Sequence, residues 1–251
     1  MNKELQTIIS RYTEQQLCLD NIVVSSFVKH NALTVQGGLL ADYCRDDVPI
    51  VDIESIEDVI NVFELAIPKA EKTKNGAIYT PKYIRDYILE RVATTQKKPL
   101  QDCFVIDIAC GCGAFLLSFA DYLHFHCGQS YRVAVNHLYG VDVSELSVKR
   151  CKILLSLAAL LNGETLTDDD FHVSQGNSLN FDFTAIPGVA ENGGFDIVVG
   201  NPPYVRAKHI DEESKVLLSH WQVASCGNVD LYLPFFEITC NILSKDGVLG
   251  Y

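Results

Sequence analysis

Short apolar runs of strand length alternate with segments of helical pattern through the chain after residue 100. The apolar runs occupy residues 104–109, 137–142, 171–173, 195–199 and 247–251. The helical segments between them occupy residues 114–123, 144–161 and 231–243. A chain in which strands and helices alternate in this way builds a mainly parallel sheet with helices packed on its faces. The sequence therefore predicts an α/β fold.

The first 73 residues have a different pattern, and we expect them to form a helical, largely polar segment. Ser55 and Asp58 have the spacing of a capping box, and apolar residues follow at helical intervals until Pro68. Residues 69–75 are charged and predict a loop. Thr80 is expected to cap the next helix, with Pro81 at its first position. The predicted domains are an N-terminal helical segment, residues 1–73, and a second domain, residues 74–251.

The composition limits the classes of function that fit the chain. It has 32 acidic and 20 basic residues and a net charge of −12, so the chain alone is not expected to bind nucleic acids strongly. Its nine cysteines are scattered and odd in number, which indicates a reduced, cytoplasmic protein. Cys110 and Cys112 lack a second ligand pair at suitable spacing, so we expect buried thiols and no metal site. No signal peptide or apolar run of membrane-spanning length is recognisable.

A glycine-rich turn, Asp107 to Phe115 (DIACGCGAF), lies between a predicted strand and a predicted helix. Glycines at that place let the backbone approach a ligand closely at the carboxyl edge of the sheet. Leu116 occupies the third glycine position of a dinucleotide-binding fingerprint, and no phosphate-loop motif is present. Asp142 ends the next strand, where a carboxylate can accept both ribose hydroxyls. A nucleoside cofactor without pyrophosphate indicates S-adenosylmethionine.

The order of these motifs is similar to that of a known enzyme family. The glycine turn resembles the first motif of class I methyltransferases, and Asn201 to Tyr204 (NPPY) resembles the catalytic motif of amino-methyltransferases. Together they resemble the gamma-type N6-adenine DNA methyltransferases of restriction–modification systems. The motifs that carry this resemblance are, in chain order, residues 79–84 (YTPKYI), 107–115, Asp142, 176–178 (GNS), 201–204 and 230–237 (DLYLPFFE).

The resemblance covers residues 74–251 and implies a Rossmann-like class I methyltransferase sheet that uses S-adenosylmethionine. It implies site-specific methylation of the exocyclic amine of adenine, flipped out of double-stranded DNA, in a prokaryotic cytoplasm. A restriction enzyme would be a partner or a fused domain. In this family the sheet continues beyond the fifth strand and a target-recognition domain follows. We therefore expect the chain to be a catalytic fragment of a longer protein, which would reconcile its acidity with a DNA substrate.

The Asn-Pro-Pro-Tyr stretch suits an exocyclic amine, whose lone pair is delocalised into the purine ring. Hydrogen bonds accepted from both amine hydrogens steer the nitrogen towards tetrahedral geometry. Asn201 offers a side-chain oxygen for this, and Pro202 offers a backbone carbonyl. Pro203 restricts the backbone so that the two acceptors converge, and Tyr204 can stack on the base. The alternative interpretation is a structural turn after a strand.

The family resemblance also implies the cofactor contacts. Thr80 would hold the methionyl carboxylate with Tyr79 nearby, and Asp142 would bind the ribose hydroxyls. Val143 would pack on the cofactor's adenine, and Asn177, where the family often has aspartate, would accept a hydrogen bond from the adenine amine. The other expected cofactor contacts are Asp107, Ala109, Cys110, Gly111, Gly113 and Asn201. Phe115 is assigned equally to core and site, whereas Tyr232 and Phe235 are expected to pack a helix against the sheet.

Three alternatives remain open on sequence grounds. Protein-glutamine methyltransferases acting on release factors resemble the Asn-Pro-Pro-Tyr motif because a side-chain amide needs the same two acceptors. They lack the Thr-Pro-x-x-Ile element that this chain has at residues 80–84. RNA guanine methyltransferases are the second alternative, because they also resemble the Asn-Pro-Pro-Tyr motif. The last alternative is an inactive, cofactor-binding fragment.

Overall fold

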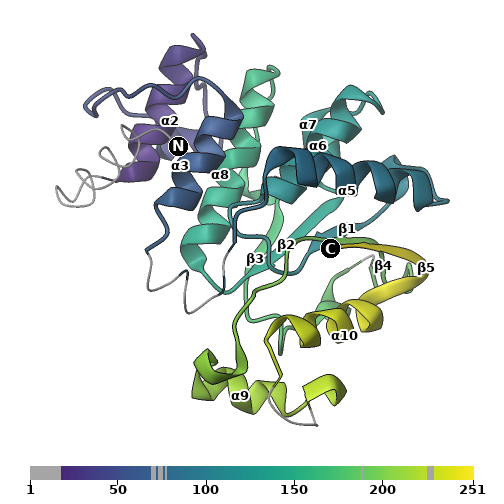
Figure 1. The fold of residues 1–251 in the computed structure, drawn as a ribbon. Helices are drawn as coiled ribbons and strands as arrows, with labels where there is room; N and C mark the ends of the chain where they lie inside the picture. The colour runs from purple at the N-terminus through teal and green to yellow at the C-terminus, as the bar shows by residue number, and fades with distance from the viewer. Residues whose placement is uncertain (1–17, 69–71, 73–75, 77, 188, 225–228) are drawn as a thin grey trace.

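The computed structural model describes residues 18–251 except 69–71, 73–75, 77, 188 and 225–228. Its centre is a parallel five-stranded sheet with the order β3-β2-β1-β4-β5 (Figure 1). The strands are β1 Val105–Asp107, β2 Leu138–Asp142, β3 His172–Gln175, β4 Phe195–Val199 and β5 Leu243–Gly250. The predicted α/β class with a Rossmann-like parallel sheet is confirmed.

Helices cover both faces of this sheet. The bounds are α2 Leu19–His30, α3 Ile56–Leu65, α5 Lys82–Thr95, α6 Ala114–Phe125, α7 Tyr131–Val135, α8 Glu145–Leu161, α9 Glu212–Leu218 and α10 Tyr232–Ile242. Short 3-10 turns occupy Leu39–Asp42, Leu100–Asp102, Asp168–Asp170, Phe183–Ala185, Ala207–His209 and Gln222–Ala224. In Figure 1, α5 to α8 lie on one side of the sheet and α10 lies on the other, with α9 at the lower end.

The register of the central strands sets the position of the site. Val105 of β1 pairs with Leu138 of β2 on one side and with Ile197 of β4 on the other. Alternate residues enter opposite cores, so that Val105 joins the core under α6 and α8 while Ile106 joins the core under α10. Because neighbouring parallel strands end at the same edge, the loops after β1, β2 and β4 converge there.

The N-terminal helices pack against α8 and extend the same core (Figure 1). The capping box of α3 is confirmed, because Ser55 accepts from the Asp58 amide while the Asp58 carboxylate accepts from the Ser55 amide. The expectation of a largely polar segment is wrong for α2, where Ile22, Val24 and Phe27 are fully buried. These side chains are buried because α2 packs against α8. The predicted loop at residues 69–75 lies outside the described residues apart from Lys72.

The predicted helix start at Thr80 is corrected by the structure. The N-cap of α5 is Pro81, whose extended backbone has ψ 148°, and the first helical residue is Lys82. The Thr80 hydroxyl does not cap the helix because it accepts a hydrogen bond of 3.1 Å from the Asn201 side-chain amide. A second difference is at β5, which begins at Leu243 and contains an irregularity before its pairing with β4 resumes at Val248.

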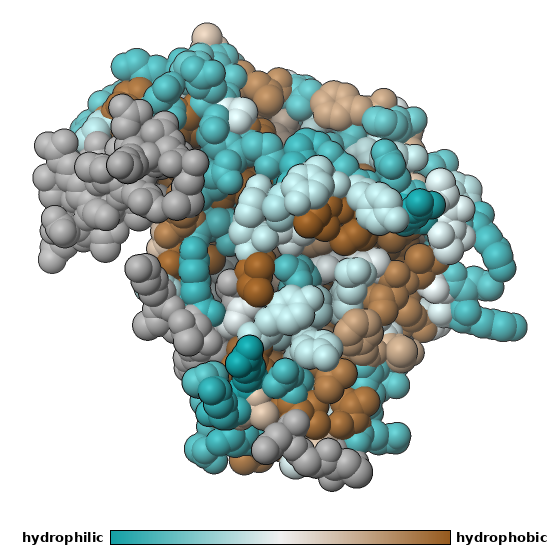
Figure 2. All heavy atoms as spheres, viewed as in Figure 1, coloured by the Kyte–Doolittle hydropathy of each residue, from teal (hydrophilic) through white to brown (hydrophobic). Residues whose placement is uncertain are grey.

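Apolar side chains are exposed on the face of the molecule that carries α5, β5 and α10 (Figure 2). Tyr83 and Tyr87 of α5 and Phe236 of α10 are among them. β5 forms one edge of the sheet.

Among the described residues, none of the helices is both long enough and apolar enough to cross a membrane.

Candidate active site

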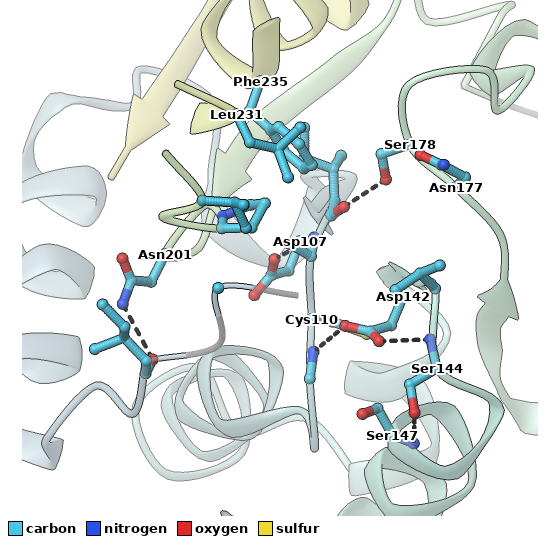
Figure 3. Close-up of a pocket in the computed structure, with 18 of the residues that line it drawn as sticks. Asp107, Cys110, Asp142, Ser144, Ser147, Asn177, Ser178, Asn201, Leu231 and Phe235 are labelled. Carbon is cyan, nitrogen blue, oxygen red and sulfur yellow. Dashed lines mark hydrogen bonds between the residues drawn. The ribbon is translucent and has the colours of Figure 1, made fainter. Parts of the chain in front are cut away.

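A cavity of about 290 Å³ lies at the carboxyl edge of the sheet (Figure 3). Its wall combines the loops that follow β1, β2, β3 and β4 with the segment that precedes α5. Most of the residues that the sequence singled out meet in this wall: Tyr79, Thr80, Asp107, Ala109, Cys110, Gly111, Asp142, Val143, Asn177, Asn201 and Pro203. The structure thus brings together motifs that are far apart in the sequence.

Three predicted site residues do not line the cavity. Pro202 is buried, and Gly113 is the N-cap of α6 with a φ of 87°. A Cβ atom at Gly113 would collide with the Sγ atom of Cys151 on α8, so this glycine is needed for helix packing. The Tyr204 ring is 51% exposed, and its centroid lies 5.7 Å from that of the Tyr232 ring.

Asp107 ends β1 and its side chain is almost completely buried. Its Oδ1 atom accepts a hydrogen bond of 2.9 Å from the Ala109 amide. Burial raises the pKa of the Asp107 carboxyl to about 7; the Ala109 hydrogen bond opposes this shift, and the Asp142 charge adds to it. Gly200 passes so close that a Cβ atom there would lie 2.6 Å from Asp107 Oδ1.

This raised pKa makes the stability of the fold depend on pH. Because the folded-state pKa exceeds that of an exposed aspartate, the contribution of the Asp107 carboxyl to stability is complete below about pH 4. It is lost as the pH rises through about 7. A cationic ligand beside Asp107 would favour the ionised form and so remove part of this cost.

Asp142 ends β2, and backbone amides hold its carboxylate in place. The Gly111 amide donates to Oδ2 and the Ser144 amide donates to Oδ1, each at 2.9 Å (Figure 3). Ser144 in turn caps α8 by accepting from the Ser147 amide. The Asp142 carboxylate is therefore fixed between the glycine turn and the start of α8. Val143, the next residue, is 51% exposed and lines the same cavity.

The orientation of the Asn201 amide is determined by its partners. Its Nδ2 atom donates to the Ile78 carbonyl at 3.2 Å and to the Thr80 hydroxyl at 3.1 Å. The Ile78 carbonyl can only accept, so the nitrogen must face it and the oxygen must face away. In Figure 3 the Asn201 amide nitrogen makes a dashed hydrogen bond and the amide oxygen lies on the opposite side. The Asn201 side chain therefore presents an acceptor oxygen on its other side.

Three other residues considered from the sequence have local roles as well as a place in the cavity wall. The Asn177 side-chain oxygen accepts from the Leu179 amide at 3.0 Å, which fixes the turn after β3. Phe235 is buried in the core under α10, as expected, and also lines the cavity. Phe115 likewise belongs to both the core and the cavity wall. Cys110 and Cys112 are buried thiols, as the sequence predicted.

Sequence reasoning missed several lining residues. The helix α3 and the residues just after it contribute Glu64 and Ile67. The helix α9 and the residues just before it contribute Ile210, Asp211, Glu213 and Ser214. Leu231 precedes α10. A single glutamate on an amphipathic helix gives no sequence signal that it faces a ligand cavity. Glu64 enters the cavity only because α3 docks against α8.

The chain is similar in sequence to methyltransferases of restriction–modification systems. Residues 136–251 match the model of the Eco57I restriction-modification methylase family. The chain is similar to the type II methyltransferase M.PaeR7I of Pseudomonas aeruginosa, with 29% identity over 70% of this chain and 31% of the relative. It is also similar to the adenine-specific methyltransferase PglX of Streptomyces coelicolor, with 23% identity over 73% of this chain and 19% of that protein.

A crystal structure from Listeria monocytogenes, described as a class I S-adenosylmethionine-dependent methyltransferase, shares the fold. Its TM-score is 0.52 at 17% identity, over 98% of this chain and 71% of that chain. The predicted resemblance to methyltransferases of restriction–modification systems is confirmed by these matches. The chain spans about a third or less of the length of the two curated relatives.

Proposed function

We propose that the chain is the catalytic part of a DNA methyltransferase that transfers a methyl group from S-adenosylmethionine to the exocyclic N6 amine of adenine. The observation that carries this proposal is the Asn201 amide, whose hydrogens are bound by Ile78 and Thr80 so that its oxygen is presented as an acceptor. It lies in one cavity with Asp107 and Asp142. The matches to restriction–modification methylases support DNA as the substrate.

The residues in the cavity wall fit the proposed cofactor. The fixed Asp142 carboxylate can accept from the ribose hydroxyls, and the buried Asp107 carboxyl can face the cationic end of the molecule. Val143 and Asn177 lie on the same wall and would contact the adenine of the cofactor. The Thr80 hydroxyl accepts from Asn201, so its own hydrogen can be donated to the methionyl carboxylate.

The bound cofactor would supply an activated methyl group on a sulfonium, so the protein mainly has to orient the amine. The Asn201 oxygen would accept from one hydrogen of the target amine. The backbone carbonyl of Pro202, a residue that does not itself line the cavity, would accept from the other. Such acceptors direct the nitrogen lone pair towards the methyl donor and stabilise the developing positive charge on the nitrogen. Tyr204 would stack on the base, which must leave the duplex to reach the cavity.

The partner proposed for this site is double-stranded DNA, with a restriction enzyme as a partner or a fused domain. The net charge of −12 makes the chain a poor electrostatic match for phosphates. We therefore propose that a target-recognition domain outside these residues supplies the basic contacts to the DNA backbone. The proposed location is the prokaryotic cytoplasm, where this DNA lies.

The proposal is tested by identifying the methylated product. The protein is incubated at low salt with S-adenosylmethionine carrying a labelled methyl group and with unmethylated DNA. The DNA is then digested to nucleosides for mass spectrometry. We expect label in N6-methyladenine. Label in N4-methylcytosine would assign a different target amine. Label that appeared only in parallel reactions with a release-factor protein or with RNA in place of DNA would contradict DNA as the substrate.

A further inference from the structure

Glu64 is the carboxyl that the N-terminal helices contribute to the cavity. Its position is fixed by the docking of α3. Arg150 of α8 is buried; its Nη1 atom donates to the Phe63 carbonyl at 3.3 Å and its Nε atom donates to Asp20 of α2 at 3.0 Å. Arg85 of α5 also pairs with Glu57 of α3. These contacts hold both ends of α3 against the rest of the fold.

The Glu64 carboxyl lies beside the glycine turn. Its Oε1 atom accepts a hydrogen bond of 3.2 Å from the Cys112 thiol. A Cβ atom placed on Gly111 would be 3.8 Å from the same Oε1 atom, which is ordinary contact distance. The Gly111 amide is also the group that holds Asp142 Oδ2. The carboxyls of Glu64 and Asp142 therefore lie near the same residue of the turn.

The surroundings of Glu64 indicate which part of a ligand it would meet. Burial raises the pKa of the Glu64 carboxyl, the Cys112 hydrogen bond and the nearby Lys72 and Arg150 charges lower it, and the Asp142 charge raises it. The contacts of both carboxyls with Gly111 place Glu64 near the ribose end of the proposed cofactor site. A ribose has vicinal hydroxyls, and each is a hydrogen-bond donor that needs an acceptor when water is excluded.

The geometry points to Glu64 as a second ribose-binding carboxyl, opposite Asp142, supplied by the N-terminal helical segment. This inference rests on the proposed S-adenosylmethionine site and deepens it. Each oxygen of Asp142 already accepts a backbone amide, and Glu64, beside the same Gly111, would add an acceptor for a ribose hydroxyl. The N-terminal helices would then be part of the cofactor site and not only a support for α8.

The test compares two ligands that share adenine and ribose but differ in the amino-acid end. S-adenosylhomocysteine has the methionine-derived chain, and 5′-methylthioadenosine lacks its amino and carboxyl groups. We expect Glu64→Ala to weaken the binding of both ligands by a similar factor of about ten, the size expected for loss of a charge-assisted hydrogen bond. Glu64→Gln, which keeps one acceptor oxygen, should retain part of the affinity for both.

The matched control is Glu90→Ala, which removes an exposed carboxyl from α5 that does not line the cavity. We expect it to leave both affinities within about twofold, because an exposed charge is screened by solvent. Unchanged affinities in Glu64→Ala, or weaker binding of S-adenosylhomocysteine alone, would overturn the inference and leave the proposed function intact. If the folded wild-type chain bound neither ligand, the proposed cofactor site would itself be wrong.

Discussion

Replacing Asn201 with alanine is expected to reduce methyl transfer by about 100-fold to 1,000-fold, the effect typical of removing one preorganised group that stabilises developing charge. The side-chain oxygen is the acceptor that the structure presents, because the nitrogen is bound to Ile78 and Thr80. Affinity for S-adenosylmethionine should change by no more than about threefold, since Asp107 and Asp142 are untouched. Single-turnover transfer of labelled methyl groups, together with calorimetric binding, measures both quantities.

Asn201→Asp provides the matched control for the orientation of this side chain. It keeps acceptor oxygens but removes the amide hydrogens, so an oxygen would face the Ile78 carbonyl and repel it. We expect this variant to lose transfer as well, because the side chain cannot keep its position. Full activity in either variant would contradict the proposed role of Asn201. Loss of transfer accompanied by an equal loss of cofactor affinity would show that Asn201 binds cofactor instead.

The second large effect is expected at Arg85, whose side chain is 1% exposed. Its guanidinium donates to the Thr80 carbonyl at 2.7 Å and to the Ser118 hydroxyl at 3.3 Å, and it pairs with Glu57. Arg85→Met should lower the free energy of unfolding by about 2–4 kcal/mol, because the buried partner of a part-buried ion pair is removed and the acceptors on Thr80 and Ser118 lose their donor. Urea denaturation followed by circular dichroism measures this loss.

Lys82→Met is the control for this prediction, because Lys82 lies on the same helix. It forms a solvent-exposed i,i+4 ion pair with Asp86. We expect it to cost less than about 1 kcal/mol. Similar losses in the two variants would refute a special role for Arg85. Arg85 joins α3, α6 and the segment before α5, and Thr80 in that segment receives the Asn201 amide. Its loss should therefore disturb the site as well as the fold.

Much of the site could be predicted because its residues come directly after strands. The apolar run of residues 195–199 matches β4 at both ends, since Gly200 and the prolines that follow cannot continue it. Parallel strands that are neighbours end at one edge, so Asp107, Asp142 and Asn201 could be expected to meet. The strand next to each of these residues, which is recognisable from the sequence, therefore indicates where the residue lies.

The features that sequence reasoning missed depend on contacts between elements that are distant in the chain. Thr80 has the residue type of a helix cap, but its hydroxyl binds Asn201, 121 residues away. Glu64 has the pattern of an exposed helical residue and becomes part of the cavity through the docking of α3. In α2 the burial of Phe27 against the core also follows from packing with α8. Local propensity cannot predict such pairings.

The most direct test of the central claim is a calorimetric titration of S-adenosylmethionine into the wild-type chain and into Asp142→Ala. We expect the wild type to bind one equivalent and the variant to bind at least about tenfold more weakly, because the carboxylate placed by Gly111 and Ser144 is removed. Circular dichroism confirms that both chains are folded. A folded wild type that does not bind S-adenosylmethionine, or a variant that binds it equally well, would contradict the proposed site.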